Sequence, residues 1–355
     1  MASGSALHVN VPLSNYAIAW KPPGEKADWF AREDFFPLVP VQKDSDLIRQ
    51  ISQGRMLEIY EALVGDDNVA GSAPIVEFAV NANLTFKCVP RVLRGIINYY
   101  KQKQADDVLM YEKRQLDAPR WALQLHCEEK ALGQLLDSTK YGGHVTNLGA
   151  NELWDDYGSS ASTIYDEIAT RLEKIVLLTG HKVNRFGMAF PTWRVIKGHP
   201  GLVRRPFINQ GGSAGTVLTK ELFEKLFEEW MEPGAVRIYK GVFNRSPSPN
   251  DDNTIDLQLF WGPGIVAAYV EPNVSVEDFS LSKGFMFSGL DGNGEPMAVI
   301  ERDAPEIQPI GGRELRLVTS MDWKLVNNKA GWIWPQVIDP TNAAYNNDAG
   351  NSYFG

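Results

Sequence analysis

The most regular pattern in the chain runs from Val76 to Cys88, where every second residue is apolar. Strict alternation of this kind is typical of a β-strand with one buried face. At ~3.3 Å per residue the run would span roughly 40 Å, whereas typical strands hold ~5–6 residues. The pattern therefore predicts a protruding two-stranded arm, whose partner strand lies within residues 36–51 and whose tip is formed by residues 54–73.

Helical periodicity marks three segments. The clearest covers residues 162–179, where apolar residues recur every three to four positions and Gly180 supplies a C-cap. A second helix is predicted over residues 117–138, beginning at a capping aspartate with Pro119 in its first turn. A third covers residues 218–231, with an apolar face opposed by glutamates. These segments predict a helical part of the fold in the first two thirds of the chain.

From Ala235 onward the pattern is that of a β-protein. Short apolar runs are separated by turn sequences such as Gly262-Pro263-Gly264 and Asp291-Gly292-Asn293-Gly294. The strands predicted here are 236–243, 255–260, 265–270, 285–287, 297–300, 314–319 and 332–338, and a further short strand is predicted at 186–189. Helices and strands in this order predict the α+β class.

The first 34 residues show no sustained periodicity. Three prolines, Pro12, Pro22 and Pro23, predict an extended chain without helix. A solvated tail should be poor in large aromatic residues, yet this segment carries Tyr16, Trp20, Trp29 and Phe30. Two interpretations remain open: a strap across its own domain, or an arm that reaches a neighbouring subunit.

Composition narrows the class of protein. The 355 residues carry a net charge of −9 and are 44% hydrophobic and 22% charged, which excludes a disordered, collagen-like or multi-span membrane protein. The acidic balance argues against a protein that binds by neutralising phosphates. Two cysteines, Cys88 and Cys127, cannot form a disulfide scaffold and indicate a reducing compartment. The chain starts without the features of a signal peptide.

One motif suggests nucleophilic catalysis. Residues 211–215 match Gly-x-Ser-x-Gly, with Ser213 as the candidate nucleophile. That motif needs an apolar strand before the serine and a histidine downstream of it. Residues 204–210 make a poor strand, and all five histidines lie upstream of Ser213. An esterase-like enzyme is therefore only an outside alternative, and no catalytic residue is predicted.

Acidic clusters give no better candidate for a metal site. A calcium-loop pattern beginning at Asp291 fails, because Pro296 replaces the required glycine and Arg302 the required glutamate. The paired aspartates at 155–156 and 251–252 lack a third acidic ligand and are interpreted as caps and loop charges. Cys-x-x-Cys, Walker and dinucleotide-binding motifs are also missing from the sequence, so no metal and no cofactor is predicted.

The order of parts resembles the major capsid proteins of tailed bacteriophages, whose Hong-Kong-97-like fold is shared with encapsulin shells. One matching place is Phe36-Pro37-Leu38-Val39-Pro40-Val41, where such proteins enter their extended loop. The other runs through Trp154-Asp155-Asp156, the 162–179 helix, Thr179-Gly180, Asn184-Arg185-Phe186-Gly187-Met188, Trp193 and His199-Pro200. Val183 departs from the pattern, because proline is usual before Asn184.

The resemblance implies an α+β fold of the Hong-Kong-97 type, divided along nearly the whole chain. The expected parts are an N-terminal arm (1–34), an extended loop (35–100), a peripheral domain with a spine helix (101–146), an axial domain (147–276), return strands of the peripheral domain (277–340) and a C-terminal tail (341–355).

The function implied is that of a non-enzymatic major capsid protein, which self-assembles into the icosahedral shell around the double-stranded DNA of a tailed bacteriophage. Its partners would be copies of itself, as hexamers and pentamers, with a portal and with scaffold or decoration proteins. It would enclose DNA without sequence-specific binding, contact no membrane, and reside in the virion after assembly in the host cytoplasm. An encapsulin-like compartment for a cargo enzyme is the alternative. The expected assembly-interface residues are Tyr16, Trp20, Trp29, Phe30, Val76, Phe78 and Phe86.

Overall fold

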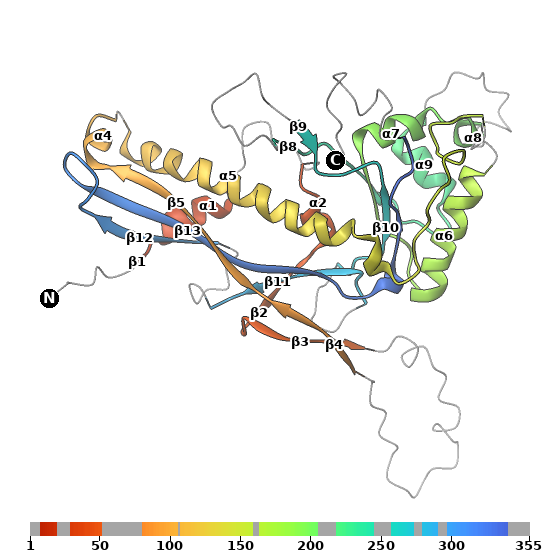
Figure 1. The fold of residues 1–355 in the computed structure, drawn as a ribbon, viewed down its shortest axis with the longest axis horizontal. Helices are drawn as coiled ribbons and strands as arrows, with labels where there is room; N and C mark the ends of the chain where they lie inside the picture. The colour runs from red at the N-terminus through yellow and green to blue at the C-terminus, as the bar shows by residue number, and fades with distance from the viewer. Residues whose placement is uncertain are drawn as a thin grey trace, which may run out of the picture.

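A computed structural model describes residues 8–19, 29–51, 80–105, 107–158, 163–204, 218–244, 257–272, 279–289 and 297–339. An elongated layer of sheet and helix occupies one end of the molecule and a compact α/β unit the other (Figure 1). Helices and strands are both abundant, which confirms the predicted α+β class. Among the described residues, none of the helices is both long and apolar enough to span a bilayer.

A six-stranded sheet forms the elongated layer. Its strands follow the order β1-β12-β13-β11-β2, and β5 pairs with the other edge of β13. Only β2 and β11 run parallel; the remaining pairs are antiparallel. The strands are β1 (His8–Val9), β2 (Leu38–Val41), β5 (Val89–Asn98), β11 (Ser282–Phe287), β12 (Ala298–Ala304) and β13 (Gly312–Leu325).

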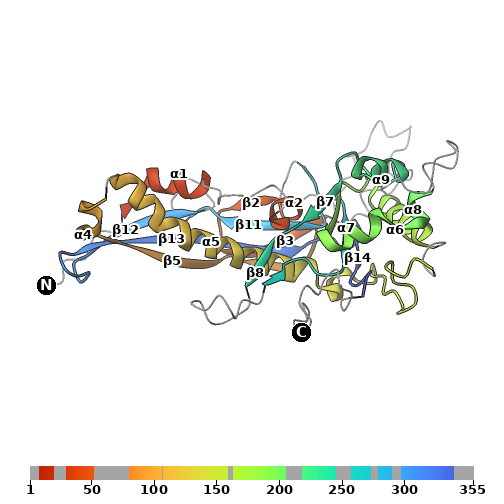
Figure 2. The same ribbon diagram turned by 90° about the horizontal axis from the view of Figure 1, so that it is seen from above.

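One long helix, α5 (Val108–Leu135), runs along a face of this sheet (Figure 2). The side chain of Asp107 caps it by accepting from the Met110 N–H at 3.1 Å. The predicted start ten residues later, at Asp117, is therefore wrong, and Pro119 lies inside the helix. Proline has no N–H to donate to the carbonyl of Gln115, four residues earlier.

That carbonyl lies against β5. A Cβ added at Gly95 would stand 2.4 Å from the Gln115 oxygen, so only glycine allows α5 and β5 to approach this closely. The short helix α4 (Tyr99–Lys103) connects β5 to α5. Helix α1 (Val11–Ala19) packs on β12 and α5. Together the helices and the sheet enclose the larger hydrophobic core.

The compact unit surrounds a four-stranded sheet in the order β14-β10-β6-β7, which has its own core. The predicted helix at 162–179 is confirmed as α6, and Gly180 ends it at a φ of 74°. The strands are β6 (Arg185–Ala189), β7 (Val236–Tyr239), β10 (Ile265–Ala268) and β14 (Gly331–Trp334), and the helices are α6 (Ile164–Thr179), α7 (Phe190–Lys197), α8 (Pro200–Val203) and α9 (Lys220–Leu226).

Helix α9 is shorter than the predicted 218–231. The chain turns after Leu226 because Val183 pairs with Met231: the Val183 N–H bonds the Trp230 carbonyl at 2.8 Å, and Glu232 returns a bond to Val183 at 2.9 Å. A further hairpin joins β8 (Val242–Asn244) to β9 (Leu257–Leu259).

The predicted two-stranded arm is present over the residues that are described. Strand β3 (Ser45–Ile51) pairs antiparallel with β4 (Val80–Lys87), and the expected tip lies outside the described residues. The partner range 36–51 was too wide, because β2 leaves the arm and joins β11 in the large sheet. After Cys88 the chain continues directly into β5, a strand that alternation alone did not reveal.

Beyond residue 235 the described regular elements are strands, apart from the 3-10 turn η5 (Asn328–Ala330), as predicted. Strands β11, β12 and β13 return to the elongated layer. Strand β14 also falls within the range expected to return there, but it pairs with β10 of the compact unit. The chain therefore crosses twice between the two units after β10.

The prediction of an N-terminal segment without helix is wrong. Pro12 sits in the first turn of α1, where a missing N–H costs nothing. The side chain of Asn10 caps this helix by accepting from the Leu13 N–H at 2.9 Å. A second helix, α2 (Ala31–Phe35), follows and packs on α5.

Candidate functional site

The described aromatic residues of the N-terminal segment lie against α5 of the same chain. The Tyr16 hydroxyl donates to Asp117 at 2.9 Å, and burial together with this bond raises the pKa of Tyr16 to about 12. Phe30 is 3% exposed and its ring lies 5.6 Å from that of Trp121. Trp29, half-buried, lies 5.2 Å from the same ring. These contacts fit the strap interpretation; Trp20 lies outside the described residues.

A buried carboxylate anchors this strap. Glu128 of α5 is fully buried and accepts backbone N–H groups at the start of α2, from Ala31 at 2.8 Å and from Arg32 at 3.2 Å. Burial raises the pKa of Glu128 to about 7, although the Arg32 charge and the two backbone donors oppose the shift. The acceptor that caps α2 thus comes from a residue distant in sequence.

Helix α2 also joins the two units of the fold. Asp34 accepts from the Tyr239 hydroxyl of β7 at 2.9 Å, and its carbonyl accepts from Arg185 of β6 at 3.0 Å. Phe35 packs so close to β6 that a Cβ on Gly187 would stand 2.8 Å from its ring. The N-terminal segment is therefore part of the joint between layer and compact unit.

Phe86, expected at an interface with another subunit, is buried within its own chain. It is 4% exposed and stacks on Phe285 with ring centroids 4.5 Å apart. The other buried residues of this small core beneath the arm are Val39, Val41, Ile48, Cys88 and Val326. The apolar face of β4 at this point is covered by β11, so an interface is not needed to explain it. Val76 and Phe78 lie outside the described residues.

Sequence reasoning missed a more exposed apolar region, strand β5. It pairs with β13 on one side only, and no other described strand pairs with its second edge. Val92 and Ile96 are 51% and 47% exposed. The run of valines and isoleucines from Val89 to Ile97 was the available signal. An exposed edge of this length normally invites another chain.

A second exposed apolar cluster lies at the end of the elongated layer remote from the compact unit (Figure 1). It combines α4, the first turn of α5 and the loop between β12 and β13. Its exposed large apolar residues are Tyr100, Val108, Leu109, Met110 and Ile310. Exposed apolar clusters of this kind mark interaction surfaces in soluble proteins.

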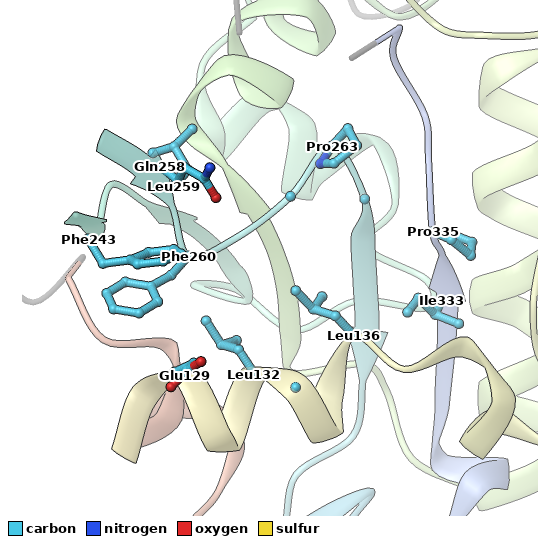
Figure 3. Close-up of a pocket in the computed structure, with 13 residues that line it drawn as sticks. Glu129, Leu132, Leu136, Phe243, Gln258, Leu259, Phe260, Pro263, Ile333 and Pro335 are labelled. Carbon is cyan, nitrogen blue, oxygen red and sulfur yellow. The ribbon is translucent and has the colours of Figure 1, made fainter. Parts of the chain in front are cut away.

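A pocket of about 400 Å³ opens between the last turns of α5, the β8–β9 hairpin and the turn at 262–264. Leu132 of α5 and Leu136, the C-cap residue of that helix, line one side, and Phe243 and Phe260 stack on another (Figure 3). Glu129 is the single ionisable residue among the described residues that line it. The pocket therefore offers a mainly apolar surface with one carboxylate at its side.

Histidine and aspartate side chains that could in principle serve catalysis or bind a metal have structural roles in the described part of the chain. His199 is fully buried, its Nδ1 accepts from the Gly201 N–H at 3.2 Å, and burial lowers its pKa to about 4. Asp155 and Asp156 accept backbone N–H groups in loops, as predicted. Ser213, Asp291 and the pair at 251–252 lie outside the described residues. The described part of the chain brings no three His, Cys, Asp or Glu residues together as metal ligands.

No protein-family model matches the chain, and no curated protein matches it significantly. Solved structures do match. A phage-related protein from Bordetella bronchiseptica is 18% identical with a TM-score of 0.69, covering 93% of this chain and 97% of that one. The mature capsid of bacteriophage PhiM1 is 13% identical with a TM-score of 0.47, covering 89% of each chain. The SrpI encapsulin of Synechococcus elongatus is 12% identical with a TM-score of 0.47, covering 94% and 96%.

The likeness to the Bordetella protein extends over both units and shows a shared fold. At TM-scores below 0.5, neither of the other two likenesses establishes a shared fold by itself. Phage capsid proteins such as that of PhiM1 are thus among the solved structures that resemble this chain.

Proposed function

We propose that this chain is a non-enzymatic shell protein, the major capsid protein of a tailed bacteriophage. The observation that carries the proposal is the shape of the fold, an elongated layer with an arm, a strand edge left open by the described strands and an exposed apolar end. Such surfaces are not expected in a protein that stays monomeric, because exposed apolar strands promote association. The similar fold of a phage-related protein supports the same proposal.

In finer terms, copies of the chain assemble as hexamers and pentamers into an icosahedral shell around double-stranded DNA, without sequence-specific binding. A net charge of −9 per chain supports this, because an acidic wall does not adhere to phosphates. A portal, with scaffold or decoration proteins, completes the particle in the host cytoplasm. The domain limits given above are kept as part of the proposal, except that the extended loop, which forms the two-stranded arm, is placed at 45–87 rather than at 35–100.

The proposed interface residues are revised by their burial. Val76 and Phe78 stay proposed as contacts between subunits, with Trp20 and the half-buried Tyr16 and Trp29. Phe30 and Phe86 are assigned to the chain's own core, where each is buried.

Electron microscopy of the purified full-length protein tests the proposal. The expected result is closed particles of uniform size whose wall has one subunit thickness. A protein that stays monomeric at all concentrations and salt conditions overturns it. Particles that form with a cargo enzyme inside, at a size too small for a phage genome, would instead indicate the encapsulin-like alternative.

A further inference from the structure

The face of the large sheet turned away from α5 carries a cluster of arginines. Gly95 points at α5, and neighbouring residues of a strand point to opposite faces, so Arg94 and Ile96 point away from the helix. The pairing register places Arg94 directly opposite Arg316 of β13, and Arg302 of β12 directly opposite Glu314. Three strands thus contribute arginines to one patch.

One carboxylate lies among the three arginines. Arg316 donates to Glu314 at 3.1 Å and Arg94 lies 3.8 Å from it. The hydrogen bond from Arg316, with the charges of Arg316, Arg94 and Arg302, holds the pKa of Glu314 below its usual value. Because three guanidinium groups share the one carboxylate that the described residues place among them, the patch keeps an excess of positive charge in a chain that is strongly acidic overall.

The acidic groups of β12 have partners elsewhere. Glu301 binds Arg313 at 3.4 Å and Asn10, and Asp303 accepts from the Tyr99 hydroxyl at 3.5 Å. Like charges directly opposite each other on neighbouring strands are destabilising. The Arg94–Arg316 pair is therefore unfavourable in the isolated chain and becomes favourable when a further anionic group approaches it.

We propose that this face, with the edge of β5 that no described strand pairs, docks a carboxylate-bearing segment of a second copy of the chain. The inference rests on the proposed shell function and names a contact that the shell would use. Charge complementarity supports a second copy as the occupant, because each copy is acidic while the patch is basic. An added strand would pair with the edge of β5, and its carboxylates would face the arginines.

Nucleic acid fits the patch less well. Val92 and Ile96 are about half exposed among the arginines, and a protein segment would cover them where a sugar–phosphate chain would not. The central Glu314 also repels phosphates but is compatible with carboxylates shared between arginines.

The test compares the self-association of matched variants of the full-length chain, by sedimentation velocity and light scattering, from low to high salt. Arg94→Glu should slow association roughly tenfold at low salt and remove most of the salt dependence, because reversing the charge replaces attraction with repulsion. Arg94→Lys keeps the charge and should associate nearly as wild type does. Lys130→Glu changes the same charge on an exposed site of α5 and should have little effect.

Folding is monitored by thermal melting. Arg94 has a side chain 71% exposed, so its replacement should leave the melting temperature unchanged. Val92→Ser tests the apolar part of the same surface without altering charge, and should weaken association too.

Two results overturn the proposal. One is an Arg94→Glu variant that associates like wild type. The other is that wild type binds a short DNA duplex and Arg94→Glu does not, while the two proteins self-associate equally. That result would make the patch a nucleic-acid contact. Failure of the shell function is a separate outcome: wild type would then show no closed particles by microscopy, whereas salt-sensitive pairing through this patch would still be measurable.

Discussion

The compact unit and the elongated layer bury their sheets in different ways. In the compact unit every residue of β10 and β14 is buried, because helices and loops cover both faces of the sheet. In the layer, β5 buries only Gly95 and Ile97. The compact unit buries its sheet within one chain, whereas the layer leaves the outer face of β5 exposed, with an edge that no described strand pairs.

The two units also differ in their buried ionisable groups. His199 caps α8 in the compact unit as a neutral imidazole, and its pKa is lowered to about 4. Glu128 caps α2 in the layer, and its pKa is raised to about 7. The free energies of unfolding of the two units should therefore change in opposite directions with pH.

The largest effect is expected from removing residues 1–36, which join the two units. Phe30 and Phe35 are buried, and truncation of a buried phenylalanine costs ~3–5 kcal/mol. Total stabilities are only ~5–15 kcal/mol. Circular dichroism should show no cooperative melting, whereas a control lacking residues 1–7 should melt like wild type. If the longer deletion melts normally and merely fails to form particles, the segment is an assembly arm after all.

Phe86→Asp and Val92→Asp distinguish core from docking surface within one continuous stretch of chain. The first places a charge in a closed core and should destabilise the arm by more than ~3 kcal/mol. The second lies on an exposed face and should leave urea denaturation unchanged while reducing self-association. Equal effects of the two variants on stability would contradict the contrast between a covered and an uncovered sheet.

Acid should weaken the compact unit through His199. Its pKa is depressed, so the unfolded chain binds the proton more tightly, and the stability present above pH 6.5 is lost as pH falls toward 4. A shift of this size corresponds to on the order of 3 kcal/mol. Hydrogen exchange of peptides from α6–α8 reports on this unit alone. His199→Asn keeps a capping acceptor and should remove the pH dependence; a variant that retains it would exclude His199 as the cause.

Raising the pH from 4.5 to about 7 should weaken the joint through Glu128. Its pKa is raised, so the stabilisation is complete below pH 4.5 and is lost as pH rises through 7, again on the order of 3 kcal/mol. Exchange of peptides from α2 and the middle of α5 should increase over that range. Glu128→Gln should flatten the profile. An unchanged profile in that variant would show that other groups control the joint.

The smallest effect is expected at Leu177, on the outer side of α6. Its side chain is 73% exposed, so Leu177→Ser should change the free energy of unfolding by no more than ~0.5 kcal/mol. Urea denaturation measures this directly. A loss of several kcal/mol would mean that the compact unit, too, depends on contacts outside the described chain.

The local sequence was sufficient to predict those elements in which all neighbouring residues favour the same backbone conformation. The 162–179 helix has a continuous apolar stripe and a glycine at its end, and α6 follows it closely. Alternation predicted the arm, and the strand-rich pattern after Ala235 predicted the β-structure found there. In each case a few neighbouring residues fix the backbone conformation, because the buried face repeats with the period of the element.

Tertiary contacts decided the rest. Pro119 lies inside α5, and the Gln115 carbonyl, to which it has no N–H to donate, lies against Gly95, a residue of another element. The cap of α2 comes from Glu128, almost a hundred residues away in sequence. Alternation shows that Phe86 and Val92 are apolar strand residues, but not that one lies beneath Phe285 and the other faces outward. Periodicity defines an apolar face; only packing determines whether the same chain or another one covers it.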